Sequence, residues 1–338
     1  FRRMEKANIA VLGSGGFGLS LAVMMDKMGH DVTVWSKFKS ELDDIRRDGE
    51  NKAKLPGVKI SESIKLTDDI SCVTGKDLVI LGIPVNFVRS VAKEAAPFIS
   101  ENTVVVNTGK GLEGGSLKFI SEVVKEEIGR PIVVLTGPSH AEEVAIGMPT
   151  TVVVASEIPE EADYVQSVMS SSTLRIYIND DVVGCEMGGA LKNIIALCAG
   201  ICDGMGYGDN TKAALMTRGM SEITRLGMAL GGKRETFAGL SGVGDLIVTC
   251  TSMHSRNRRA GILIGKGTDP AEAVKQVGTV EGYFCTKAAY EIAQKNNICM
   301  PITEQCYNVL YNGADPHDAI KCLMGRPKKH ETEPNLFL

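Results

Sequence analysis

A lysine within an almost uninterrupted apolar segment is a candidate for proton transfer in this chain. Lys192 and its neighbour Asn193 lie in the segment 183–202, which otherwise consists mainly of Gly, Ala, Leu, Ile and Cys. Burial disfavours the charged form of an amine and lowers its pKa, whereas nearby anions raise the pKa again. Such an amine can donate and accept a proton near neutral pH. The alternative is that the long side chain reaches outward to solvent and has no chemical role.

Two segments further along the chain could supply partners for this lysine and for a substrate. Asp245 stands among glycine and apolar residues, where an acid needs a partner such as a lysine ammonium. Residues 255–259 read Ser-Arg-Asn-Arg-Arg and combine hydroxyl, guanidinium and amide donors ahead of a helical pattern. Those donors suit a phosphate dianion, which arginine binds through two parallel hydrogen bonds. A solvated basic face is the alternative for this second segment.

Glycines at a fixed spacing near the N-terminus could hold a pyrophosphate. The apolar run 9–12 leads into Gly13-Ser-Gly15-Gly16-Phe17-Gly18, and a helical pattern follows without a gap. In a strand–turn–helix motif of this kind the first glycine permits the tight turn and the second lets the backbone approach the pyrophosphate. The third lets the helix pack closely on the strand. Glycines also collect in ordinary turns, but this placement favours dinucleotide binding at the helix N-terminus.

Lysines follow two other apolar runs that are typical of strands. Ser36 and Lys37 come directly after the run 31–35, so we expect no carboxylate there to repel a 2′-phosphate on the adenosine ribose. Lys37 could pair with such a phosphate, which favours tolerance of NADP(H) without excluding NAD(H); a solvated loop lysine is the alternative. Lys110 follows the run 103–107 and could hold substrate oxygens, the alternative being an exposed turn lysine.

Three more turns could contribute to a site. Residues 137–141, Gly-Pro-Ser-His-Ala, could offer backbone N–H groups to the substrate or to the nicotinamide amide. We assign His140 to packing or loop structure, because the sequence shows no carboxylate partner for it. Phe87 could pack against a cofactor or within the core. The turn at Val280 and Glu281 carries a carboxylate that could reach ribose hydroxyls.

The elements that must position these residues change in character along the chain. Short apolar runs alternate with amphipathic segments up to about residue 179, at 9–12, 31–35, 77–83, 103–107, 131–135 and 150–155. This alternation predicts a parallel sheet with helices on both faces, whose ligands bind beyond the carboxyl ends of the strands. Strand-like runs then largely disappear. The predicted class is α/β, with a Rossmann-type, mainly parallel sheet domain followed by an all-α C-terminal domain.

The change of pattern also suggests domain limits. We expect a dinucleotide-binding domain over 1–179, a helical substrate and catalytic domain over 180–330, and a flexible tail over 331–338. Most of the candidate chemistry falls just after the strands of the first domain or on the helices of the second.

Composition limits the classes of partner and compartment. The 338 residues are 43% hydrophobic and 23% charged, with a net charge of −4 and a pI near 5.9. This balance argues against nucleic acid as the main partner. No stretch is expected to reach the length of a membrane span, and no secretory signal opens the chain. Nine scattered cysteines without paired C-x-x-C spacing argue against a metal site and favour a reducing, cytoplasmic setting.

Taken together, these segments resemble the NAD(P)-dependent sn-glycerol-3-phosphate dehydrogenases, above all the bacterial-type soluble enzymes. The blocks that carry the resemblance are Lys110-Gly-Leu-Glu113, Gly137-Pro-Ser139, Gly188-Gly-Ala-Leu-Lys192-Asn193, Gly242-Val-Gly-Asp245 and Ser255-Arg256-Asn257-Arg258. The resemblance implies an oxidoreductase that interconverts dihydroxyacetone phosphate and sn-glycerol 3-phosphate by hydride transfer with NAD(P)H. It further implies a supply of glycerol phosphate for phospholipid synthesis, a helical second domain and a cytoplasmic homodimer.

The resemblance also implies roles for single residues. Lys192 corresponds to the proton donor and acceptor, with Lys110 and Asp245 as further catalytic positions. The implied substrate contacts are Lys110, Gly137, Ser139, Asn193, Thr249, Ser255, Arg256 and Asn257. The implied contacts to NADP(H) or NAD(H) are Gly13, Gly15, Gly16, Phe17, Gly18, Lys37, Lys110, Ala141, Arg256, Val280 and Glu281. One departure is Gly109, where many members carry Ser or Thr, so a side-chain hydroxyl contact is not available there.

Two other hypotheses stand beside this one. A two-domain dehydrogenase of the β-hydroxyacid or 6-phosphogluconate type also uses a helical lysine, so Lys192 does not decide between them. The blocks at 110–113 and 255–258 favour the glycerol phosphate enzyme. A non-catalytic module that senses NADP(H) would bind NADPH without oxidising it in the presence of dihydroxyacetone phosphate.

Overall fold

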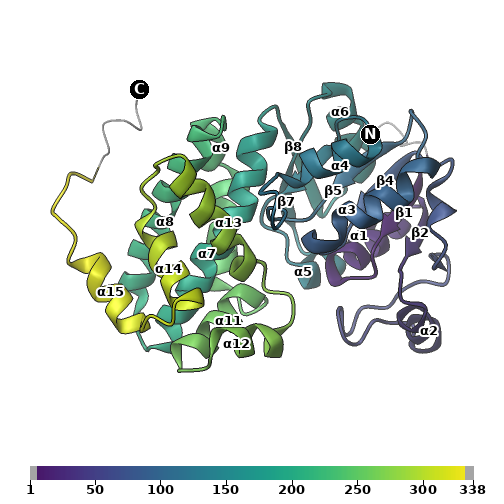
Figure 1. Ribbon diagram of the computed structural model, residues 1–338. Helices are drawn as coiled ribbons and strands as arrows, with labels where there is room; N and C mark the ends of the chain where they lie inside the picture. Colours follow the sequence, from purple (N-terminus) through teal and green to yellow (C-terminus); the bar gives the residue numbers. More distant parts are fainter. Residues whose placement is uncertain (1–5, 332–338) are drawn as a thin grey trace. The chain divides into compact units, whose positions relative to one another are not determined.

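The computed structural model describes residues 6–331, which form two compact units that meet in sequence between Glu186 and Met187. The first unit is an α/β domain and the second consists of helices (Figure 1). This confirms the predicted fold class. The unit boundary falls inside helix α7 (Val182–Gly204), whereas the sequence pattern changes near residue 180. The predicted tail lies outside the described residues apart from Glu331.

The first unit is built on an eight-stranded sheet with the strand order β3-β2-β1-β4-β5-β6-β7-β8. The strands are β1 (Asn8–Leu12), β2 (Asp31–Trp35), β3 (Lys65–Thr67), β4 (Leu78–Leu81), β5 (Val104–Asn107), β6 (Val133–Thr136), β7 (Thr150–Ala155) and β8 (Leu174–Asn179). The edge strands, the three-residue β3 and the six-residue β8, were not among the predicted runs. Neighbouring strands run parallel except β6 and β7.

The antiparallel pair β6–β7 is the exception within the mainly parallel sheet that the sequence predicts. The connection from β6 to β7 covers residues 137–149 and contains one short helix, the five-residue α5 (Ala141–Ala145). Such a helix spans about 7–8 Å, which is too short to carry the chain back along β6 for a parallel crossover. The chain therefore begins β7 beside the carboxyl end of β6, and β7 runs back antiparallel to it.

Both faces of the sheet are covered, as the apolar runs predict. Alternate residues of β1 point to opposite sides, so Ile9 lies in one buried cluster and Leu12 in another. The first cluster is closed by α1 (Gly16–Lys27), α2 (Lys39–Asp48), α5 and α6 (Pro159–Met169). The second is closed by η1 (Ile70–Val73), α3 (Val85–Ala95) and α4 (Ile120–Ile128), and η2 (Ala96–Phe98) follows α3.

The second unit is helical throughout its described part (Figure 1). After α7 come α8 (Asp209–Ala229), α9 (Arg234–Phe237), the π-helical turn η3 (Leu240–Gly244), α10 (Asp245–Thr251), α11 (Arg256–Gly265), α12 (Pro270–Val277), α13 (Glu281–Lys295), α14 (Pro301–Tyr311) and α15 (Pro316–Met324).

Helix α7 corrects the expectation that no stretch could cross a membrane. It has 23 residues and a mean hydropathy of 1.4 over its most apolar window, enough for a span by length and composition. In the structure, however, 83% of that window is buried inside the protein. A helix that is apolar on all sides is typical of the core of a helical domain, and we assign α7 to that place.

Glycines bring α7 and α11 into direct backbone contact. A Cβ atom on Gly200 would lie only 2.1 Å from the carbonyl oxygen of Arg258, and Gly261 of α11 faces α7 just as closely. Gly204 and Gly265 repeat the contact one turn further on. Because side chains cannot separate the two helices, the first residues of α11 are held at a fixed place beside α7.

Candidate active site

Lys192 is buried in the second unit and paired with an acid. The side chain of Lys192 is 6% exposed and that of Asp245 is 1% exposed. Lys192 Nζ donates hydrogen bonds to the Asp245 carboxylate and, at 2.7 Å, to Thr249 Oγ1. The alternative of a lysine that reaches bulk solvent is therefore wrong. Asp245 has the ammonium partner that its apolar setting requires.

Local backbone geometry brings α10 close enough to α7 for this pair to form. Asp245 and Thr249 lie one turn apart on α10, directly after the π-helical turn η3. A Cβ atom on Gly188 of α7 would lie 2.5 Å from the carbonyl oxygen of Ser241. A Cβ atom on Gly242 would lie 2.0 Å from a carbonyl oxygen of the preceding segment. Only glycine at these two positions allows the approach, and π-helical turns are frequent at functional sites.

A chain of amide groups joins three helices beside the lysine. Asn257 Nδ2 donates to Asn193 Oδ1 at 2.9 Å, and Asn257 Oδ1 accepts the N–H of Gly282 at 2.8 Å. The start of α11 and the start of α13 are thereby tied to α7. Val280 and Glu281, two of the predicted cofactor residues, directly precede Gly282. The structure thus brings predicted substrate residues together with one of the predicted cofactor turns.

The basic segment 255–259 divides into residues with different surroundings. Ser255 caps α11, since its Oγ accepts the N–H of Arg258 at 3.2 Å, and Arg256 is exposed at the first position of the helix. The Arg258 side chain, which is 14% exposed, donates to Asp203 at 2.8 Å and to the carbonyl oxygen of Thr251 at 2.6 Å. The alternative of a wholly solvated basic face is therefore wrong. A guanidinium at a helix N-terminus suits an anion.

The glycine-rich turn of the first unit leaves no room for side chains at its key positions. Gly13 has a φ of +124°, and a Cβ atom there would lie 2.4 Å from the carbonyl oxygen of Gly82. A Cβ atom on Gly18 would lie 2.7 Å from the carbonyl oxygen of Gly13. At Gly15, by contrast, the nearest atom to such a Cβ is 3.6 Å away. The turn is closed on the protein side and open at Gly15, which fits a pyrophosphate at the N-terminus of α1.

Neighbouring segments flank this turn. A Cβ atom on Gly16 would lie 2.7 Å from the carbonyl oxygen of Lys54 and 3.5 Å from the Cβ atom of Ala141. Phe17 is partly buried against the sheet core. The predicted cofactor residues Gly16, Phe17 and Ala141 therefore lie at one place, and the loop that contains Lys54, which sequence reasoning missed, joins them.

Lys110 is half-buried and bonded to the turn after β6. Its Nζ donates to the carbonyl oxygen of Gly137 at 2.7 Å and lies 3.5 Å from Ser139 Oγ. Gly137 has a φ of +117°, which a side chain would strain. The three predicted substrate residues of this unit thus meet at the carboxyl ends of β5 and β6. The alternative of an exposed turn lysine is wrong.

An ion pair that the sequence did not reveal holds the loop behind Lys110. Arg89 of α3 donates to both carboxylate oxygens of Glu113, at 2.7 and 2.8 Å, and to Glu127 of α4 at 2.7 Å. The hydrogen bonds from Arg89 lower the pKa of Glu113. A two-bond arginine–carboxylate contact fixes orientation as well as distance. It ties the loop 108–119 to α3 and α4.

The edge of the sheet beside Lys37 contains a carboxylate that we did not expect. Lys37 is exposed, but Glu41 in the first turn of α2 turns back toward the end of β2. Glu41 Oε2 accepts hydrogen bonds from Ser14 Oγ and, at 3.3 Å, from Ser36 Oγ; its Oε1 accepts one from Lys54 Nζ at 2.7 Å. The expectation of no carboxylate at this edge is wrong, because the helix start brings Glu41 back to Ser36.

Two other candidates, Phe87 and His140, each lie at the start of a helix. Phe87 is 57% exposed at the start of α3, so its alternative role in the core is wrong. His140 precedes α5, and its carbonyl oxygen accepts the N–H of Val144 at 3.1 Å. His140 therefore belongs to the loop structure that begins the helix.

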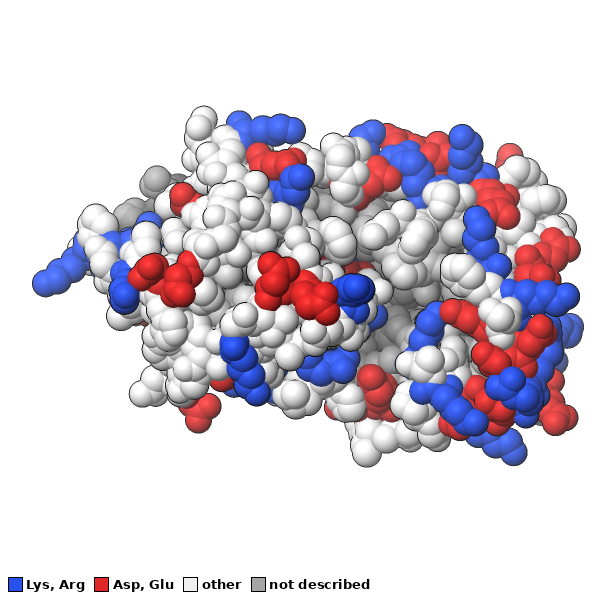
Figure 2. Space-filling view, turned by 60° about the horizontal axis from the view of Figure 1, so that its bottom comes forward, with Lys and Arg blue, Asp and Glu red and all other residues white. Residues whose placement is uncertain are grey.

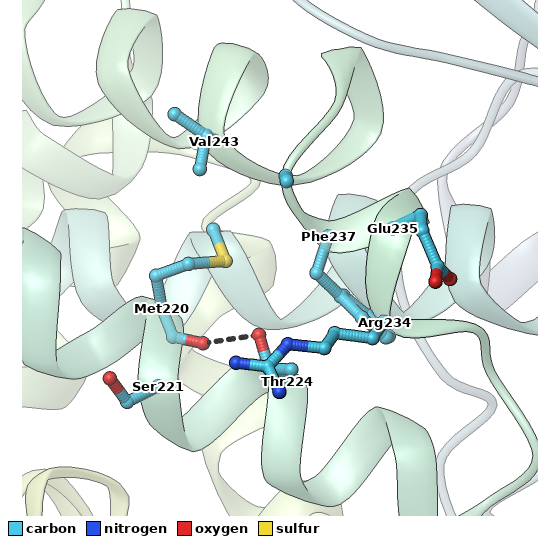
Figure 3. A pocket seen from close by; sticks show the side chains of 8 residues that line it. Met220, Ser221, Thr224, Arg234, Glu235, Phe237 and Val243 are labelled. Carbon is cyan, nitrogen blue, oxygen red and sulfur yellow. Dashed lines mark hydrogen bonds between the residues drawn. The ribbon is translucent and has the colours of Figure 1, made fainter. Parts of the chain in front are cut away.

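Charge and cavities elsewhere add little to this site. On the face shown in Figure 2, acidic and basic side chains are interspersed. Among residues 6–331 no group of three or more His, Cys, Asp or Glu is arranged to hold a metal ion. The second unit contains a cavity of about 390 Å³ whose lining includes none of the predicted site residues (Figure 3). Its lining residues are Met220, Ser221, Thr224, Arg234, Glu235, Phe237, Ala238 and Val243.

Comparisons with known proteins agree over nearly the whole chain. The family described as NAD-dependent glycerol-3-phosphate dehydrogenase N-terminus matches residues 8–162, and the corresponding C-terminus family matches residues 181–321. The glycerol-3-phosphate dehydrogenase [NAD(P)+] of Desulfitobacterium hafniense is 52% identical, over 97% of this chain and 94% of the relative. That of Moorella thermoacetica is 54% identical, over 97% and 98%.

Solved structures show the same similarity. The glycerol-3-phosphate dehydrogenase of Coxiella burnetii superposes with a TM-score of 0.91 at 37% identity, over 95% of this chain and 99% of that chain. A ketopantoate reductase from Ralstonia eutropha has a TM-score of 0.61 at 13% identity, which shows a shared fold and no more.

Proposed function

Because the chain belongs to the NAD-dependent glycerol-3-phosphate dehydrogenase family, we propose that it interconverts dihydroxyacetone phosphate and sn-glycerol 3-phosphate with NADH or NADPH. The observation that carries the proposal is the buried Lys192, bonded to Asp245 and Thr249. The glycine-rich turn and the donors at the start of α11 support it, since they suit a dinucleotide and a phosphate. We assign the glycine-rich turn of the first unit to dinucleotide binding and Lys192 of the second unit to proton transfer.

Lys192 is the proposed proton donor. When bound, NADH or NADPH would supply the hydride for C2 of the ketone, and negative charge would develop on the C2 oxygen. Lys192, as an ammonium, stabilises that charge and donates the proton that makes the alcohol. Asp245 keeps the amine charged, because a neighbouring carboxylate favours the ammonium form. In the reverse direction the neutral amine accepts the proton.

The remaining site residues bind and orient the ligands in this proposal. Arg256, with Ser255 and Asn257 at the N-terminus of α11, holds the substrate phosphate, so binding energy remote from C2 positions the ketone. Asn193 orients Asn257 through the amide chain. We assign Lys110, Gly137 and Ser139 to substrate oxygens and, from the family resemblance, Lys110 and Arg256 also to the dinucleotide. The proposed cofactor contacts are Gly13, Gly15, Gly16, Phe17, Gly18, Lys37, Ala141, Val280 and Glu281.

The resemblance to the bacterial-type enzymes supports three wider assignments. We assign the enzyme to the cytoplasm, to a homodimer and to the supply of glycerol phosphate for phospholipid synthesis. Light scattering coupled to size-exclusion chromatography tests the dimer, because a single species at the monomer mass would contradict it.

An absorbance assay at the NAD(P)H band tests the activity. Purified protein is mixed with NADH or NADPH, and dihydroxyacetone phosphate or a 3-ketoacid is then added. In a separate reaction, 6-phosphogluconate is added with the oxidised cofactor. We expect turnover with dihydroxyacetone phosphate and none above background with the other two substrates. Turnover confined to a ketoacid or to 6-phosphogluconate would contradict the proposal. Binding of NADPH with no oxidation of it would point to a sensing module instead.

A further inference from the structure

Four polar side chains meet at the carboxyl ends of β1 and β2, and we refer to Ser14, Ser36, Glu41 and Lys54 as the Glu41 cluster. Glu41 accepts from both serines and from Lys54, whose ammonium lies 2.7 Å from Glu41 Oε1. Ser14 Oγ also donates to Ser36 Oγ at 3.1 Å. Both serines are 3% exposed, whereas the Glu41 side chain is 26% exposed. The carboxylate is thus fixed from the protein side and still partly open.

The cluster occupies a defined place in the dinucleotide fold. β1 and β2 are parallel and paired with Leu12 opposite Trp35, so Ser14 and Ser36 follow at adjacent strand ends. Gly13 N–H donates to the carbonyl oxygen of Trp35 at 2.8 Å, which joins the glycine-rich turn to the end of β2. In folds of this kind the adenosine ribose lies at the end of the second strand. There an acidic residue about twenty positions beyond the glycines accepts from its 2′-hydroxyl.

Glu41 carries a full negative charge at neutral pH. Burial alone would raise its pKa, but hydrogen bonds from Lys54, Ser14 and Ser36 outweigh burial and lower it. The ion pair with Lys54 offsets part of the charge, and Lys54 is 42% exposed, so solvent screens the pair.

We propose that Glu41 is the residue by which this enzyme favours NADH over NADPH. Its carboxylate accepts a hydrogen bond from the free 2′-hydroxyl of NADH and opposes the 2′-phosphate of NADPH. Lys54 limits this discrimination because it neutralises Glu41 and offers a cation to the phosphate. Lys37, which is exposed, also offers a cation to the 2′-phosphate and so limits the discrimination further. The inference rests on the proposed use of a nicotinamide dinucleotide.

Dissociation constants measured without substrate test the inference. The fluorescence of NADH and NADPH is titrated with wild-type protein, Glu41→Gln and Lys54→Met, with Asp44→Asn as the matched control. Asp44 lies on the same helix, is 61% exposed and forms a 2.9 Å ion pair with Arg47, away from the Glu41 cluster. The control therefore removes one carboxylate charge from α2 without touching the Glu41 cluster.

We expect the wild type to bind NADH more tightly than NADPH. Glu41→Gln shifts the ratio of the two constants toward NADPH by about tenfold or more, since a like charge next to the phosphate is removed. Lys54→Met shifts the ratio the other way, and Asp44→Asn leaves it within about twofold. Lys54→Met keeps the inference testable if circular dichroism shows that Glu41→Gln does not fold.

The outcomes separate this inference from the proposed function. Equal changes of both constants in Glu41→Gln, or a wild type that favours NADPH, would overturn the role of Glu41 and leave the proposed activity standing. A wild type that binds neither dinucleotide would overturn both.

Discussion

Replacing Lys192 by methionine removes the proposed proton donor while keeping most of the side-chain volume. Two effects follow from the structure and they can be separated. The first is chemical, because general acid catalysis contributes about 10²–10⁴-fold to a rate. We expect kcat for dihydroxyacetone phosphate reduction to fall by about that factor. The dissociation constant of NADH should stay within about twofold, since the glycine-rich turn belongs to the other unit.

The second effect is on stability. Lys192 and Asp245 are 6% and 1% exposed, so the variant leaves a carboxylate buried without its ammonium. Breaking a buried pair by removing one partner costs about 3–5 kcal/mol in the free energy of unfolding. For a unit of this size that lowers the melting temperature by about 10 °C.

A double variant distinguishes the two effects. Lys192→Met with Asp245→Leu removes both charges and should recover much of the lost melting temperature, because apolar replacements of a buried pair are often neutral. It should recover none of the lost kcat. Initial rates at the NAD(P)H absorbance band and thermal melts followed by circular dichroism measure both quantities. Turnover that returns together with stability would refute Lys192 as the proton donor and leave it a structural residue.

Three further predictions concern phosphate binding, dinucleotide binding and the pH dependence of stability. Arg256→Ala should raise KM for dihydroxyacetone phosphate by tenfold or more, because an arginine–phosphate contact is charge-assisted; steady-state rates check this, and an unchanged KM and kcat would count against the phosphate role. Gly13→Ala should abolish measurable NADH binding in fluorescence titration, since a Cβ atom would lie 2.4 Å from the Gly82 carbonyl oxygen at a φ of +124°. Glu222 is buried, and burial raises its pKa to about 7 although its carboxylate accepts the N–H of Ile302 at 2.7 Å. Because the pKa of Glu222 is higher in the folded state than in the unfolded state, Glu222 stabilises the fold below its unfolded pKa near 4.5. This stabilisation is lost as the pH rises through its folded pKa of about 7. In urea unfolding, the contribution of Glu222 to the free energy of unfolding should therefore be about 2–3 kcal/mol smaller at pH 7.5 than at pH 4.5. Glu222→Gln should remove this dependence of the free energy of unfolding on pH.

Much of the sheet and of the site could be predicted because local sequence carries the information. The run 9–12 must be a strand before a glycine-rich turn, and an acid at Asp245 among apolar residues must find a cation. Lys192 meets that requirement across a separation of 53 residues. In such cases burial and hydrogen-bonding demands are visible in the residue types themselves.

Other features depend on tertiary geometry that a single sequence does not display. Nothing around Glu41 indicates that the first turn of α2 returns its carboxylate to Ser36. The Arg89–Glu113 pair likewise joins two segments whose charges look like ordinary surface residues. The antiparallel β7 follows from the shortness of α5, which propensity does not determine. The contact of α7 with α11 depends on where Gly200 meets its partner helix.

The central claim is that Lys192 delivers the proton to the C2 oxygen of the substrate. A crystal structure of the protein with dihydroxyacetone phosphate and oxidised cofactor, a combination that cannot react, tests it directly. We predict Lys192 Nζ within about 3 Å of the ketone oxygen, with the phosphate held at the start of α11. A ketone oxygen bonded to another group, with Lys192 bonded only to Asp245 and Thr249, would contradict the account.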